Sequence, residues 1–125
     1  MFANKAPGFS YTRIGNPIVS AVEQKMTQLE GSTASAVCAS GMAAISSALL
    51  NLVRAKDEIV AAAGLYSGTV ELLRSFEALG IHTRYVPKNT VSEYEKRING
   101  KTRVVFAETI GNPRLDVTDV VVNSS

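Results

Sequence analysis

Residues 35–50 contain a short apolar run that passes directly into a helix-forming segment. The run Ser35–Ala39 is nearly unbroken in apolar residues, a pattern typical of a strand that is buried on both faces. After Ser40 and Gly41, the segment 42–50 is rich in alanine and leucine, which favours an α-helix. We therefore expect a strand, a tight turn and a helix whose first main-chain N–H groups are unpaired.

The turn at Ser40 and Gly41 is a candidate anion site, because unpaired N–H groups and the helix dipole together favour a phosphate. Gly41 has no side chain to block a close approach, and the Ser40 hydroxyl can either donate to an anion or cap the helix. An ordinary N-cap at a strand–helix junction explains the same residues, since short motifs match by chance. The remaining sequence has to decide between these interpretations.

Composition places the chain among globular proteins, because 46% of its 125 residues are hydrophobic and 19% are charged. The net charge of +2 is spread without long runs of one sign, so neither nucleic acid nor a membrane surface is an expected partner. No signal segment or membrane-spanning run is evident. Cys38, the single cysteine, is expected to be a small buried hydrophobe in a reduced, cytoplasmic setting. His82, the single histidine, has no metal-ligand pattern around it, so no metal site is expected.

The first fifteen residues show no periodicity and contain scattered aromatic residues, among them Phe2, Phe9 and Tyr11. This pattern predicts an extended arm over 1–15 that lies on another surface, such as a second subunit. A helix follows, opened by Asn16-Pro17 and closed by a glycine at position 31. We expect residues 16–125 to belong to one α/β domain, of which they form a part.

Strand and helix patterns then alternate along the chain. The predicted strands are Asp57–Ala63, Ile81–Val86 and Thr102–Ala107, and the predicted helices are Thr69–Leu79 and Ser92–Ile98, the latter opened by a Ser92–Glu95 capping box. Such alternation predicts an α/β fold with a largely parallel sheet, in which the strands at 57–63 and 102–107 are expected to be buried. Ligands bind such sheets at the carboxyl ends of the strands. The helix over 42–52 is apolar nearly all round, which predicts that it is buried. The loops at Ser40-Gly41, Tyr66 and Asn112 are expected to face one crevice.

Four motifs in order resemble the Cys/Met-metabolism family of enzymes that use pyridoxal 5'-phosphate (PLP). They are Tyr11–Pro17, Ser40–Ile45, Leu65–Thr69 and Glu108–Pro113. The family includes O-acetylhomoserine sulfhydrylase, cystathionine γ-synthase, cystathionine lyases and methionine γ-lyase, and the sequence looks most like the first and last of these. The resemblance implies part of the PLP-binding large domain of the aspartate-aminotransferase-like (fold type I) architecture, with a role in methionine and cysteine metabolism.

The resemblance also implies a phosphate site. The PLP phosphate would lie on the N–H groups of Gly41 and Met42 with Ser40 nearby. In the family, a Tyr-x-Arg pair binds the phosphate of the neighbouring subunit, and here that pair is Tyr11 and Arg13. The arm would then have a purpose in a homo-oligomer. Without the resemblance, the sequence favours a solvated loop residue at Arg13.

Tyr66 matches the family tyrosine that stacks on the PLP ring and takes part in proton transfer, although an aromatic ring packed under a loop explains it too. Asn112 matches the asparagine near the ring hydroxyl, and plain Asn-Pro turn chemistry is the alternative. Glu108 either orders the site or caps a loop.

The family's PLP-binding lysine, preceded by Ser-x-Thr, has no match among the six lysines of this sequence. The aspartate that pairs with the pyridine nitrogen and the arginine that grips the substrate carboxylate also come later in the family's chain. The resemblance therefore implies the N-terminal portion of an enzyme for γ-elimination or γ-replacement, not catalytic alone. The alternative is a non-catalytic remnant that binds phosphate compounds or pairs with a full-length paralogue. An unrelated nucleotide-binding module is disfavoured, because neither Gly-x-Gly-x-x-Gly nor a P-loop is present.

Overall fold

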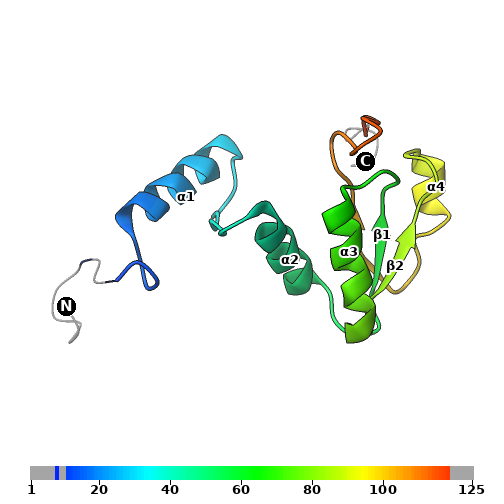
Figure 1. The fold of residues 1–125 in the computed structure, drawn as a ribbon, viewed down its shortest axis with the longest axis horizontal. Helices are drawn as coiled ribbons and strands as arrows, with labels where there is room; N and C mark the ends of the chain where they lie inside the picture. Colours follow the sequence, from blue (N-terminus) through cyan, green and yellow to red (C-terminus); the bar gives the residue numbers. More distant parts are fainter. Residues whose placement is uncertain (1–7, 9–10, 119–125) are drawn as a thin grey trace. The chain divides into compact units, whose positions relative to one another are not determined.

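A computed structural model describes residue 8 and residues 11–118 of the chain. Its contacts divide the chain into two compact units, Met1–Ser40 and Gly41–Ser125 (Figure 1). Phe2 and Phe9, and with them most of the arm predicted over 1–15, lie outside the described residues.

The first unit contains helix α1, Pro17–Leu29, as the sequence predicts. The Asn16 side chain accepts a hydrogen bond from the Ile18 N–H at 2.8 Å, and Pro17 occupies the first turn. Gly31 follows the helix with φ +59°, a conformation that glycine adopts without strain. The predicted start and stop signals of this helix are therefore confirmed.

The buried strand predicted at Ser35–Ala39 is wrong: the segment joins no sheet, and Val37 is 47% exposed. A strand needs a neighbouring strand for its main-chain groups, and the described part of the first unit contains only α1. The Val37 N–H instead donates to Glu23 Oε1 at 3.0 Å, and Thr27 Oγ1 donates to Ser35 Oγ at 3.0 Å. Cys38 is half-buried rather than part of a core.

The second unit alternates helices and strands. Its elements are α2 (Gly41–Leu52), β1 (Glu58–Ala61), α3 (Ser67–Phe76), the 3₁₀ turn η1 (Glu77–Leu79), β2 (His82–Tyr85), α4 (Val91–Glu95) and β3 (Thr102–Phe106). Helix α2 forms where predicted, but its predicted burial is wrong: only Leu49 is buried, and Leu52 is 60% exposed. Helix α4 begins after the N-cap Thr90, so the predicted capping box is also wrong, since Ser92 lies inside the helix.

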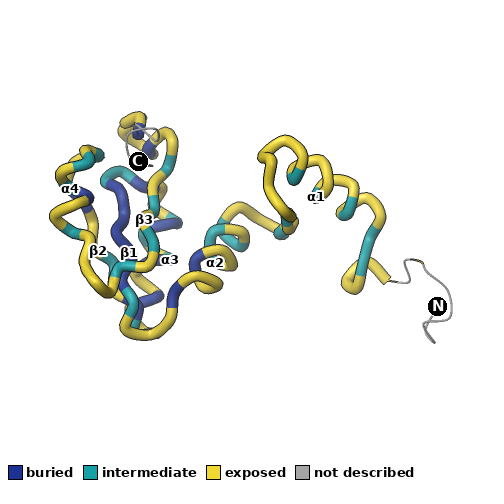
Figure 2. The backbone as a smooth tube through the Cα atoms, turned by 180° about the vertical axis from the view of Figure 1, so that it is seen from behind, coloured by how far each residue is buried: buried dark blue, intermediate teal, exposed yellow. Residues whose placement is uncertain are grey.

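The three strands form a parallel sheet in the order β2-β1-β3, which confirms the predicted fold class. In Figure 2 the central strand β1 is buried along its length, whereas β2 and β3 carry exposed residues. Burial was predicted for the strands that form β1 and β3, and the structure confirms it for β1 but not for β3. Within the described residues, each outer strand has a neighbouring strand on one side only. Its other edge is therefore open there.

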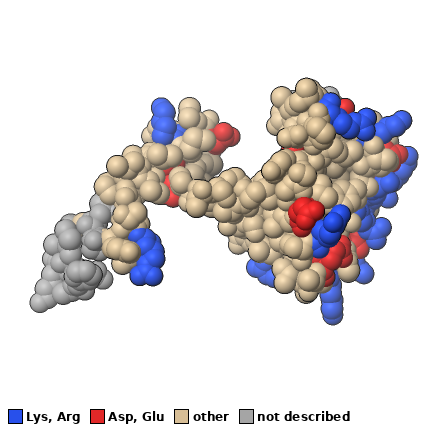
Figure 3. Space-filling view, in the orientation of Figure 1, with Lys and Arg blue, Asp and Glu red and all other residues tan. Residues whose placement is uncertain are grey.

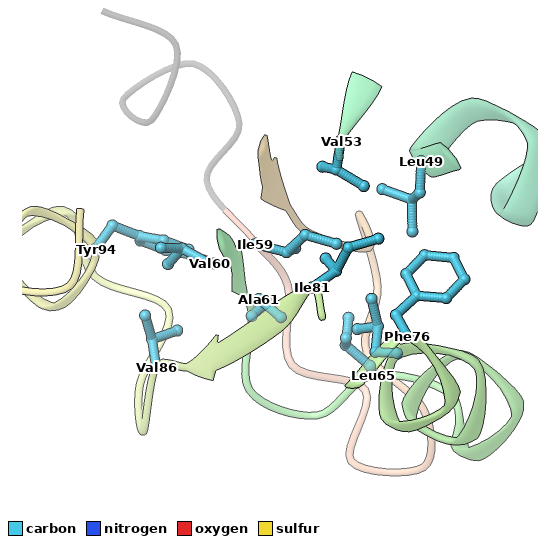
Figure 4. Close-up of a cluster of buried hydrophobic side chains, with 12 residues drawn as sticks. Leu49, Val53, Ile59, Val60, Ala61, Leu65, Phe76, Ile81, Val86 and Tyr94 are labelled. Carbon is cyan, nitrogen blue, oxygen red and sulfur yellow. The ribbon is translucent and has the colours of Figure 1, made fainter. Parts of the chain in front are cut away.

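The core of the second unit lies on both faces of β1 (Figure 4). Ile59 points toward Val53 and Phe76, which come from the end of α2 and from α3. Val60 points to the opposite face, where Tyr94 of α4 covers it. This alternation follows from the two-residue period of a strand, and it fixes the carboxyl end of β1 between two packed layers.

A buried carboxylate opens β1. Glu58 is 5% exposed, and it accepts hydrogen bonds from Arg84 Nε at 2.5 Å and from Asn99 Nδ2 at 2.8 Å. These bonds, that of Arg84 first, lower the pKa of Glu58 below its ordinary value of 4.5. Because the folded pKa is lower than the unfolded one, ionised Glu58 stabilises the fold above pH 4.5, and this contribution is lost as the pH falls through the folded pKa.

We expect Glu58→Gln to lower the melting temperature at neutral pH and to flatten its fall on acidification below about pH 4.5. A smaller slope should remain, because hydrogen bonds also lower the pKa values of Glu77 and Glu93. The measurement is thermal unfolding between pH 3 and pH 7, with exposed Glu95→Gln as the control. Parallel curves for the Glu58 variant and the wild type would contradict the assignment.

Candidate functional site

Tyr66 lies where β1 leads into α3, at the carboxyl edge of the sheet. It is the N-cap residue of α3, and its side chain is 47% exposed and forms no hydrogen bond with the described residues. A Cβ at Gly68 would lie 2.5 Å from the Tyr66 ring, so the absence of a side chain there lets the ring lie against the first turn of the helix. The structure thus presents an accessible aromatic ring at the predicted end of the sheet.

Glu108 follows β3 and joins the neighbouring loop to Tyr66. Its carboxylate accepts hydrogen bonds from the Tyr66 N–H, at 3.1 Å and 3.3 Å from the two oxygens. It also accepts from Thr69 Oγ1 at 3.2 Å, and Thr69 is fully buried. The Glu108 carboxylate therefore binds the first turn of α3 and the residue before it, while its expected role in ordering a ligand site stays a prediction.

Asn112 lies on the loop that follows Glu108, and this loop is bound to the loop that carries Tyr66. The Asn112 N–H donates to the Gly64 carbonyl at 2.9 Å, and the Gly111 N–H donates to the Asp116 carbonyl at 2.8 Å. The Asn112 side chain is exposed and forms no hydrogen bond with another described residue. The structure therefore brings Tyr66 and Asn112 to the same edge, as the sequence predicts, with both side chains free to meet a ligand.

Gly111 allows the close contact between these two loops. A Cβ at this buried position would lie 2.8 Å from the Gly64 carbonyl oxygen, a main-chain atom that cannot swing away as a side chain would. We expect Gly111→Ala to destabilise the second unit by about 1–3 kcal/mol. Gly100→Ala is the matched control, because a Cβ there meets nothing within 4 Å. Equal denaturation midpoints for the two variants would contradict a tight contact.

Asn89 and Thr118 were missed by the sequence analysis, and they connect all three loops at this edge. Asn89 Oδ1 accepts from the Ala63 N–H at 3.1 Å, while its Nδ2 donates to Thr118 Oγ1 at 3.2 Å. Thr118 Oγ1 in turn donates to the Glu108 carbonyl at 2.8 Å. Asn89 follows β2 after Pro87-Lys88, so its position just beyond a strand was the only sequence signal for its role.

A cavity of about 240 Å³ opens beside this network. It is lined by Ala63, Pro87, Lys88, Asn89, Arg114 and Asp116.

Figure 3 shows acidic and basic side chains interspersed over the visible face of the second unit. The described residues contain no group of three or more histidine, cysteine or acidic residues that could hold a metal ion, and His82 contacts Glu77 at 2.6 Å.

The remaining predicted site residues lie at or before the junction of the two units. Gly41 and Met42 begin α2, and a Cβ at Gly41 would meet nothing within 4 Å. Ser40, Tyr11 and Arg13 belong to the first unit and are exposed. The Arg13 guanidinium lies 5.6 Å from the centre of the Tyr11 ring and forms no ion pair within the described residues. No described helix is long and apolar enough to cross a membrane.

A sequence model of the family described as Cys/Met metabolism PLP-dependent enzyme matches residues 1–124. This chain belongs to that family. Its predicted membership and cofactor class are confirmed by this match.

Curated relatives in this PLP-dependent family act on sulfur amino acids or their precursors. The chain is 42% identical over 125 residues to the O-acetyl-L-homoserine sulfhydrylase of Leptospira meyeri, covering 99% of this chain and 28% of that protein. It is 39% identical over 120 residues to the L-methionine gamma-lyase of Porphyromonas gingivalis, covering 95% of this chain and 30% of that protein. The chain thus spans less than a third of the length of these relatives.

Solved structures show the same fold. The O-acetylhomoserine sulfhydrylase of Wolinella succinogenes superposes with a TM-score of 0.82 at 36% identity, covering 87% of this chain and 31% of the other. A Campylobacter jejuni protein assigned as an O-acetylhomoserine (thiol)-lyase gives a TM-score of 0.83 at 30% identity, covering 98% and 31%. The latter structure contains N'-pyridoxyl-lysine-5'-monophosphate. The chain therefore has the fold of part of a PLP-dependent enzyme.

The described residues fit the family's cofactor in their chemistry. Tyr66 offers an exposed aromatic face, and the Asn112 amide forms no hydrogen bond with the described residues, which suits a ring with a hydroxyl group. Gly41 leaves open space at the first turn of α2, as a close approach by a phosphate requires. Arg13 supplies a planar fork of donors that matches phosphate oxygens.

Proposed function

We propose that this chain forms part of the cofactor site of a PLP-dependent enzyme that carries out γ-replacement or γ-elimination on a sulfur amino acid or an O-acylated homoserine. The observation that carries the proposal is the pairing at the carboxyl edge of the sheet. There, Glu108 binds the Tyr66 main chain, and Asn112 lies on the loop that follows. Parallel sheets bind ligands at this edge, which supports a cofactor site here.

When bound, PLP supplies an electron sink for the bonds around the substrate α-carbon. The residues of this chain would bind and orient it. The Tyr66 ring would stack on one face of the pyridine and its hydroxyl would move protons, while the Asn112 amide would hydrogen-bond the ring hydroxyl. These contacts fix which face of the cofactor stays open for the substrate.

The phosphate would lie on the N–H groups of Gly41 and Met42, with the Ser40 hydroxyl beside them. Tyr11 and Arg13 would contact the phosphate bound by a neighbouring subunit, so we propose a homo-oligomer. We also propose that the protein acts in the cytoplasm. The exposed Arg13 guanidinium, free of ion pairs in the described residues, supports this role. We propose further that these 125 residues are not catalytic alone, because none of their lysines has the family's Ser-x-Thr context.

The function is tested by assaying the intact protein, meaning the full-length natural gene product, with PLP and two substrates. O-Acetyl-L-homoserine with sulfide should give homocysteine and acetate if the reaction is γ-replacement. L-Methionine with water should give methanethiol, 2-oxobutyrate and ammonia if it is γ-elimination. Activity on either supports the proposal and selects the reaction. PLP binding without turnover of either would instead favour a non-catalytic protein that binds phosphate compounds.

A further inference from the structure

We infer that Glu108 is a positioning residue: it holds the Tyr66 segment against the loop that carries Asn112 and so sets the geometry of the cofactor face. This inference rests on the proposed function for its consequence, but the contact itself is tested without a cofactor.

Helix α3 lacks the usual local contact for its N-cap residue. In a capping box, a glutamate or glutamine at the third helical position reaches back to the N-cap N–H. In α3 the N-cap is Tyr66 and the third position is Thr69, whose short side chain carries no carboxylate. The Thr69 hydroxyl donates to Glu108 instead, and Glu108 accepts the Tyr66 N–H. A residue 42 positions away therefore supplies the missing carboxylate.

Because Glu108 is distant from α3 in the sequence, its carboxylate connects two loops, which a carboxylate within α3 would not do. A glutamate at position 69 would secure only the helix, whereas Glu108 belongs to the segment that continues into Asn112. The same carboxylate therefore links the two side chains that the proposed function places on the cofactor. Since Thr69 is fully buried, one of the two groups bound to Glu108 is fixed in the core.

The main chain of Glu108 is itself fixed by a hydrogen bond. Its main-chain carbonyl accepts from Thr118 Oγ1 at 2.8 Å, and Thr118 is bound to Asn89 after β2. Farther along the loop, the Asn112 N–H binds the Gly64 carbonyl, which lies just before Tyr66. The loops after β2 and β3 therefore fix the position of Glu108. The hydrogen bonds of its carboxylate in turn fix the Tyr66 main chain.

The first test is amide hydrogen exchange of the intact protein without PLP, in peptides that span Tyr66 and Asn112. We expect Glu108→Ala to speed exchange at both segments by at least tenfold. Glu108→Gln keeps one acceptor oxygen and should restore part of the protection. Glu95→Gln, at an exposed position of α4, should change neither segment. Unchanged exchange in Glu108→Ala would overturn the inference.

The second test measures PLP affinity and the absorption spectrum of the protein saturated with PLP. We expect Glu108→Ala to weaken binding several-fold and to shift the spectrum, with Glu108→Gln between it and the wild type. Val53→Ala, which removes methyl groups from the buried core just before the start of β1, controls for loss of stability alone. A spectral change of the same size in Val53→Ala would overturn the positioning role.

The two tests separate this inference from the proposed function. If the wild type binds no PLP but Glu108→Ala releases the Tyr66 and Asn112 segments, the inference holds and the proposed function fails. If PLP binds with unchanged affinity and spectrum although those segments are released, the positioning of the cofactor face is refuted while the proposed function stands.

Discussion

Replacing Leu73 with alanine is expected to lower the free energy of unfolding of the second unit by about 2–5 kcal/mol. Leu73 lies on α3, is fully buried and belongs to the hydrophobic core around β1. Truncation removes buried methyl groups and leaves a cavity that the surrounding core fills only in part. Because α3 carries Tyr66 at its start, the loss should also loosen the carboxyl edge of the sheet.

The measurement for Leu73→Ala is chemical denaturation of the intact protein, with Leu79→Ala as the matched control. Leu79 is 53% exposed in η1, so its truncation should cost much less. Similar losses for the two variants would show that α3 does not pack on β1 as described.

Replacing Tyr66 with alanine is expected to weaken PLP binding roughly tenfold, because the cofactor ring would lose its stacking partner. Tyr66→Phe keeps the ring, so it should bind PLP nearly as tightly and lose turnover instead. This pair of variants separates stacking from proton transfer. PLP titration followed by absorbance gives the affinities, and the assay for homocysteine or 2-oxobutyrate gives the rates.

Tyr85→Ala controls for the loss of an exposed aromatic ring. Tyr85 is 41% exposed, close to the value for Tyr66, but it lies beside Arg74 and Glu77. Its truncation should leave PLP affinity unchanged. If Tyr66→Ala binds PLP as tightly as the wild type, or if Tyr85→Ala weakens binding as much, the Tyr66 ring does not form the cofactor face.

Local signals predicted the elements whose partners lie nearby in the chain. Asn16-Pro17 and the glycine at 31 marked α1, since capping depends on a few adjacent residues. The apolar run at β1 correctly predicted a buried strand, because the neighbours β2 and β3 are both present to cover its edges. The carboxyl edge, with Tyr66 and Asn112, followed from parallel strands and from the family resemblance.

The wrong predictions of burial share a physical cause: an apolar pattern records what a segment can bury, not what is available to cover it. Ser35–Ala39 has the composition of an inner strand, yet the described part of its unit offers no strand to pair with. The segment 42–52 is apolar enough for a buried helix, yet α2 buries only Leu49 within the second unit. Both segments need surfaces that these residues do not supply.

The site was predicted only where a residue type carries its own signal. Tyr66 and Asn112 stand in recognisable motifs, whereas the role of Glu108 depends on a main-chain N–H 42 positions away. Asn89 and Thr118 are ordinary loop residues in the sequence, and their role exists only because three strand ends meet. Long-range hydrogen bonds of this kind leave no periodic pattern along a single sequence.

The most direct test of this account is a crystal structure of the intact protein grown with PLP. We expect the pyridine ring to lie against Tyr66, with Asn112 within hydrogen-bonding distance of the ring hydroxyl. We expect the phosphate to lie on the N–H groups of Gly41 and Met42. PLP bound elsewhere, for example in the cavity beside Lys88 and Arg114 with the Tyr66 ring uncovered, would contradict it.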